Sequence, residues 1–106
     1  LAGQKILDRC VAIASVDFSH DTPERERNAL DMQTVSFLEN GFYDTLLALP
    51  GTRVDSPASL VLLDMYIKNR NKKAQSGILY QSSSVLMLGE PPEYPSVGYV
   101  VYGYWK

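Results

Sequence analysis

The stretch Val11-Ala-Ile-Ala-Ser-Val-Asp-Phe-Ser-His20 decides the predicted fold of this 106-residue chain. Its apolar, β-prone first half predicts a strand over residues 10–16, buried on both faces within a parallel or mixed sheet. The chain then reaches Asp17 and His20, the single histidine present. Because open α/β proteins bind ligands outside the carboxyl ends of their strands, an acid and an imidazole at this point predict a functional site.

Turn and capping residues on either side of this stretch predict helices. Thr22 is a suitable N-cap and Pro23 suits the first helical turn, so a helix is expected to follow His20. Asp55 or Ser56 is expected to cap a later helix in the same way. In all, helices are predicted over residues 1–9, 23–40, 42–49 and 55–70.

Two β-prone segments, over 76–80 and 96–104, predict strands near the end of the chain. The element order predicts an α/β fold, a three-layer sandwich-type sheet with helices on its faces. Three strands are too few for a stable sheet covered on both sides, and the first residue is Leu1 rather than methionine. We therefore interpret residues 1–106 as the C-terminal part of a single α/β domain.

The composition excludes several classes of partner. Ten basic and twelve acidic residues give a net charge of −2, which provides no electrostatic footprint for nucleic acid and no basic helix for a membrane surface. The apolar runs are far shorter than the roughly 20 residues of a membrane span. One cysteine, Cys10, allows no internal disulfide and fits a reducing, cytoplasmic location. The expected partner is a small molecule or a peptide.

The segment Ser15-Val-Asp-Phe-Ser-His20 resembles the Ser-Ser-Asp-Phe-Ser-His signature of the Memo family, the protein B of the AmmeMemoRadiSam system. Further landmarks follow in the family's order. They are an acidic helix with Asp31, a Leu-Pro-Gly break, Val54-Asp-Ser-Pro57, Tyr80-Gln-Ser-Ser-Ser84 and Val97-Gly-Tyr99. The resemblance covers essentially the whole chain but corresponds only to the C-terminal part of a Memo protein.

The resemblance implies a fold like that of the class III extradiol dioxygenases (LigB-like) and a metal-competent pocket. In the family, two histidines from the preceding half and a cysteine form the metal site, a ligand set that suits iron or copper. Here Ser56 stands where many members carry that cysteine, and a neutral serine is a poor substitute for a thiolate. The resemblance thus implies iron or copper for the full-length protein, but the metal ligands within this chain are unknown and no cofactor is assured for it alone.

The resemblance also implies roles for individual residues. His20 is predicted to act as a general base or metal neighbour, and Asp17 to orient it, so these two are the candidate catalytic residues. Asp55, Ser56 and Ser83 are the candidate substrate-binding residues. The purely structural alternatives are a turn-capping role for His20 and helix-capping roles for Asp55 and Ser56.

Three functions remain open on these grounds. The first is a Memo-like protein with metal-dependent redox or dioxygenase-like chemistry when full length; the fragment alone is not expected to be active. The alternative is a non-catalytic binding or scaffold module that keeps the fold but has lost the metal site. The third is a structural subunit whose exposed sheet edge pairs with another chain, either a missing N-terminal half or a second copy.

Overall fold

The predicted first strand is not formed in the part of the chain that the computed structural model describes, residues 14–105. Residues 14–16 belong to no helix or strand. Val16 packs against the hydrophobic core, so the apolar run serves burial rather than strand pairing. The prediction was therefore wrong for residues 14–16, while residues 10–13 and the helix expected over 1–9 lie outside the described range.

Four helices are present in the described range. They are α2 (Glu24–Glu39), α3 (Tyr43–Leu47), α4 (Pro57–Arg70) and α5 (Ser84–Leu88). The first three confirm the predicted helices; α5 was not predicted. Helix α2 ends before Gly41, whose φ of +69° is the left-handed conformation that glycine adopts at low cost. Thr22 does not cap α2: Pro23 occupies the N-cap position and the Thr22 hydroxyl donates to the His20 carbonyl oxygen at 3.0 Å.

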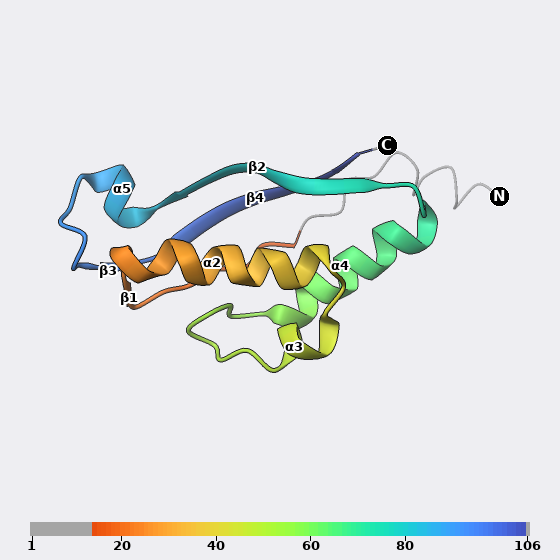
Figure 1. The fold of residues 1–106 in the computed structure, drawn as a ribbon, viewed down its shortest axis with the longest axis horizontal. Helices are drawn as coiled ribbons and strands as arrows, with labels where there is room; N and C mark the ends of the chain where they lie inside the picture. The colour runs from red at the N-terminus through yellow and green to blue at the C-terminus, as the bar shows by residue number, and fades with distance from the viewer. Residues whose placement is uncertain (1–13, 106) are drawn as a thin grey trace.

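The described strands form two separate antiparallel pairs. Strand β1 (Thr22–Pro23) pairs with β3 (Pro95–Ser96), and β2 (Gln75–Ser83) pairs with β4 (Gly98–Trp105). The second pair is a long ribbon above α2 and α4 in Figure 1. This arrangement confirms an α/β unit, and both sheets are antiparallel rather than parallel.

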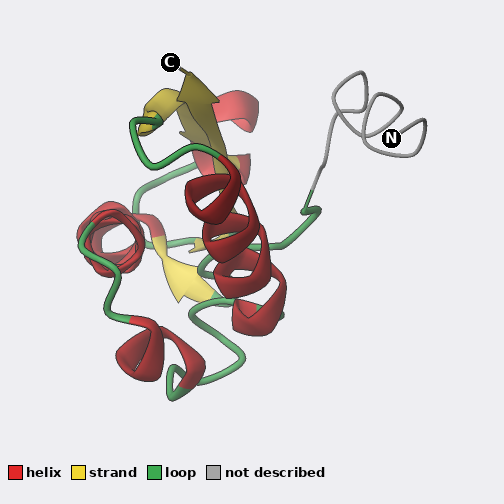
Figure 2. Ribbon diagram, turned by 90° about the vertical axis from the view of Figure 1, so that its right-hand side faces the viewer, coloured by secondary structure: helices red, strands yellow, loops and turns green. Residues whose placement is uncertain are grey.

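The hydrophobic core lies between the helices and one face of the β2–β4 ribbon. Figure 2 shows the helices and strands turned by 90° from the view of Figure 1. Side chains alternate along β4, so Val100 and Tyr102 pack against the core while Tyr99 and Val101 are exposed. The buried apolar members are Phe18, Val35, Leu38, Leu46, Val54, Leu60 and Val61. Among the described residues, no helix has the length and apolar character to cross a membrane.

Candidate functional site

The loop that carries Asp17 and His20 is held by backbone hydrogen bonds to the segment before α4. The His20 N–H donates to the Thr52 carbonyl oxygen at 2.9 Å, and the Asp55 N–H donates to the Asp17 carbonyl oxygen at 3.1 Å. The Asp55 carboxylate in turn accepts a hydrogen bond from the Asp17 N–H at 3.0 Å. The structure thus brings Asp17 and Asp55 together, and Asp55 fixes the Asp17 backbone.

His20 is half-buried and is anchored at three points. Besides its N–H, its carbonyl oxygen accepts from Thr22, and its ring Nδ1 lies 3.1 Å from the Phe18 carbonyl oxygen. A carbonyl can only accept, so a neutral His20 ring carries its proton on Nδ1 and leaves Nε2 as the basic nitrogen. The Phe18 carbonyl, rather than the Asp17 carboxylate proposed from the sequence, orients the ring.

The residue after His20 has an unusual backbone conformation. Asp21 has φ of +54°, and in the described range it is the one residue other than glycine with a positive φ. Such a conformation costs free energy and persists only where surrounding contacts impose it. This unfavourable backbone conformation lies next to the anchored imidazole of His20, and such conformations are common at functional sites.

The two serines proposed as substrate-binding residues have different surroundings. The Ser56 hydroxyl lies 2.7 Å from that of Ser59 and makes no capping bond, although Ser56 occupies the N-cap position of α4. Ser83 is buried and caps α5 by accepting from the Leu86 N–H at 3.1 Å. Ser83 also helps to lower the pKa of Glu24. Both hydroxyls are therefore engaged within the fold.

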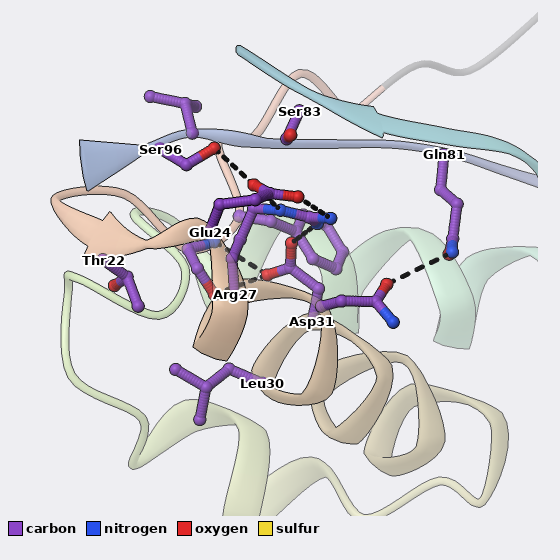
Figure 3. Close-up of polar contacts among 12 residues, drawn as sticks. Thr22, Glu24, Arg27, Leu30, Asp31, Gln81, Ser83 and Ser96 are labelled. Carbon is purple, nitrogen blue, oxygen red and sulfur yellow. Dashed lines mark hydrogen bonds and ion pairs between the residues drawn. The ribbon is translucent and has the colours of Figure 1, made fainter. Parts of the chain in front are cut away.

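A buried ionic network joins helix α2 to this loop, and Figure 3 shows its contacts. One Asp31 oxygen accepts from the Ser19 N–H at 3.0 Å and from the Ser19 hydroxyl at 2.5 Å. The other accepts from Arg27 at 2.8 Å, and Arg27 also binds both oxygens of Glu24. Ser96 completes the network by donating to Glu24 at 2.7 Å.

The charged forms of this network stabilise one another. Burial acts to raise the pKa of Glu24, but hydrogen bonds from Arg27, Ser96 and Ser83 outweigh it and the pKa is lowered. Burial likewise acts to lower the pKa of Arg27, and its bonds to Glu24 and Asp31 raise it instead. Glu24 and Arg27 therefore both stay ionised at neutral pH. The sequence signal that could have revealed this network is the spacing of Glu24, Arg27 and Asp31, which places the three side chains on one face of the helix.

A second buried carboxylate, Asp64, joins α3, α4 and β4. It accepts from the Tyr43 hydroxyl at 2.5 Å and the Tyr104 hydroxyl at 2.7 Å, and Lys68 Nζ lies 3.0 Å away. Burial, and then the Asp64 carboxylate, raise the pKa of Tyr43 to about 12 and also raise that of Tyr104. This cluster was not predicted from the sequence, because its members are far apart in the chain: Tyr43 lies 21 residues before Asp64 and Tyr104 lies 40 residues after it.

We expect the two tyrosines to make the protein sensitive to alkali. Tyrosine has a pKa of about 10 in an unfolded chain, so a raised folded value means that the folded state holds its proton more tightly. This stabilisation is fully present below about pH 10 and is lost as pH rises towards about 12. Urea unfolding of the wild type should show this fall, and Tyr43→Phe should flatten it. An unchanged slope in the variant would contradict the assignment.

The metal site implied by the family resemblance is not assembled by the described residues. Among residues 14–105, no three His, Cys, Asp or Glu side chains are grouped so that they could hold a metal ion. His20 offers Nε2, but one oxygen of Asp55 is engaged by the Asp17 N–H and Ser56 is paired with Ser59. Cys10 lies outside the described residues. The donor set present in this range therefore does not fit iron or copper by itself.

A small hollow lies on the core side of the ribbon. It has a volume of about 60 Å³, and Val16, Phe18, Leu60 and Tyr102 are among the residues that line it. His20, Asp17 and Asp55 do not line this hollow. Its largely apolar wall suits neither a metal ion nor a charged ligand.

Comparison with known proteins adds no assignment. No family model, curated protein or solved structure matches this chain.

Proposed function

We propose that this chain carries a ligand-binding site centred on His20 and built on a Memo-like α/β scaffold, and that it binds its ligand without turning it over. The resemblance of Ser15–His20 to the Memo signature supports the family, the three-layer sheet and a cytoplasmic location. The observation that carries the binding role is the three-point anchoring of His20, which fixes Nε2 as a hydrogen-bond acceptor. Preorganisation of this kind lowers the entropic cost of binding.

The polar groups on the His20 loop and on the segment paired with it define the chemical class of the ligand. Asp17 and Asp55 are exposed carboxylates on the two paired segments, and Nε2 is an acceptor. A site made of acceptors and negative charge favours a ligand that donates hydrogen bonds and carries positive charge. A small amine or the amino group of a peptide meets both requirements.

A second candidate is a metal-dependent oxidoreductase. It is favoured by the contact between His20 Nδ1 and the Phe18 carbonyl oxygen, because metal-binding histidines commonly use the same second contact to fix the ring. His20 would then supply one ligand through Nε2, and the remaining ligands would come from outside the described residues.

One NMR experiment distinguishes the two candidates, because the ring signals of the single histidine are assigned without ambiguity. The ring ¹⁵N signals of the full chain would be recorded while methylammonium or Zn²⁺ is added, Zn²⁺ serving as a diamagnetic imidazole-binding metal. We expect methylammonium to shift Nε2, and one equivalent of Zn²⁺ to leave it unchanged.

The control variant is Asp17→Asn, which removes an exposed charge while the Asp17 backbone keeps its bonds to Asp55. It should weaken the methylammonium effect and leave the free ring signals unchanged. Saturation by one equivalent of Zn²⁺, abolished in His20→Ala, would overturn the binding proposal in favour of the metalloenzyme. The absence of any methylammonium effect would refute the proposed ligand class.

A further inference from the structure

The fully buried carboxylate of Asp31 is connected to the His20 ring through a single peptide group. Asp31 accepts from the Ser19 N–H at 3.0 Å, and the Phe18 carbonyl of the same peptide group faces His20 Nδ1 at 3.1 Å. We propose that Asp31 is a positioning residue that fixes the tautomer and orientation of His20 through the Phe18–Ser19 peptide. The inference rests on the proposed function, because His20, the residue that Asp31 positions, is the centre of the proposed site.

The rigidity of the peptide bond makes this connection effective. The carbonyl oxygen of Phe18 and the N–H of Ser19 lie in one plane and point in opposite directions. An acceptor that holds the N–H therefore also sets the direction of the carbonyl. A carboxylate polarises the peptide as well, so its carbonyl becomes a stronger acceptor for the Nδ1 proton of His20.

Asp31 can perform this role because it is itself immobilised. It lies on the sixteen-residue helix α2, Arg27 binds its second oxygen at 2.8 Å, and the Ser19 hydroxyl binds its first. On the ribbon side, Gly98 donates its N–H to the Ser19 carbonyl oxygen at 2.8 Å. Burial removes competing water, so these bonds are stronger than they would be at the surface.

The loop itself provides no alternative support for this peptide group. Residues 17–20 belong to no helix or strand, and the flanking bonds of Asp17 and His20 to residues 52–55 leave the Phe18–Ser19 peptide between them. Its N–H is bound by Asp31 rather than by a neighbouring strand. Without the Asp31 charge, the Phe18 carbonyl would be held less firmly and would be a weaker acceptor for the Nδ1 proton of His20.

The experiment compares Asp31→Asn with Asp64→Asn in the full chain. Both aspartates are fully buried, both lie on long helices and both pair with a cation four residues away, so Asp64 is a matched control for the loss of a buried charge. The tautomer ratio of His20 is read from its ring ¹⁵N signals without ligand. We expect Asp31→Asn to change that ratio roughly tenfold towards Nε2 protonation, the scale of replacing a charged hydrogen-bond acceptor with a neutral one. Asp64→Asn should leave it unchanged.

A second variant tests the path. Ser19→Ala removes the hydroxyl bond to Asp31 but keeps the peptide N–H, so it should preserve the wild-type tautomer ratio. If Asp31→Asn lowers stability but leaves the His20 signals as in the wild type, or if Asp64→Asn changes them equally, Asp31 is only structural and the inference fails. These signals are measured without ligand, so the outcome is independent of whether methylammonium binds.

Discussion

Replacement of Gly98 by alanine is expected to destabilise the folded chain by about 3 kcal/mol, the range of overpacking combined with disruption of a buried ion pair. A Cβ atom at Gly98 would overlap the carboxylate of Asp31. That carboxylate cannot move aside at low cost, because Ser19 and Arg27 hold both of its oxygens. Thermal unfolding should show a fall in Tm of more than about 10 °C.

Gly51→Ala is the matched control, because no atom lies within 4 Å of the position its Cβ would occupy. Neither Gly98 nor Gly51 has the positive φ that would strain alanine, so the comparison isolates the steric overlap. The control should melt within about 2 °C of the wild type, as surface substitutions usually do. A Gly98→Ala protein that melts like the control would show that the buried network tolerates displacement.

Removal of the Asp64 carboxylate is also expected to lower the stability of the fold by a large amount. Asp64→Ala leaves the hydroxyls of Tyr43 and Tyr104 without their acceptor and Lys68 without its partner. Breaking a buried charged cluster from one side costs about 3–5 kcal/mol, because the remaining polar groups stay desolvated. Urea unfolding at neutral pH measures this loss directly.

The exposed carboxylate of Glu93 provides the control, and Glu93→Ala should change stability by less than about 0.5 kcal/mol. A double-mutant cycle with Tyr104→Phe tests the mechanism. Once Asp64 is absent, the second substitution should cost much less than it does in the wild type. Strictly additive effects would indicate that the tyrosine and the carboxylate do not interact.

The helices were predictable because their signals are local. Helix α4 has Pro57 in its first turn and Lys68 and Arg70 in its last, and α2 ends before Gly41 as expected. The predicted strand over residues 14–16 was wrong for a physical reason. An apolar run indicates burial, but a strand also needs a partner for its backbone, and no local sequence signal specifies that partner.

The candidate site was likewise predictable from the sequence only in part. Asp17, His20 and Asp55 were selected from the sequence, and the structure brings Asp17 and Asp55 into contact. The contacts that give His20 its chemical state were not predictable, because Asp31 reaches its loop across 12 residues and through the backbone.

The sequence by itself determined the approximate bounds of α2, α3 and α4, the net charge of −2 and the placing of a single histidine after an apolar run. These depend on residues close together in the chain or on composition alone. Tertiary structure decided which carboxylates are buried, which donors they receive and which nitrogen of His20 is basic. Those properties depend on donors and acceptors from distant segments meeting at about 3 Å, and on the exclusion of water that their packing brings.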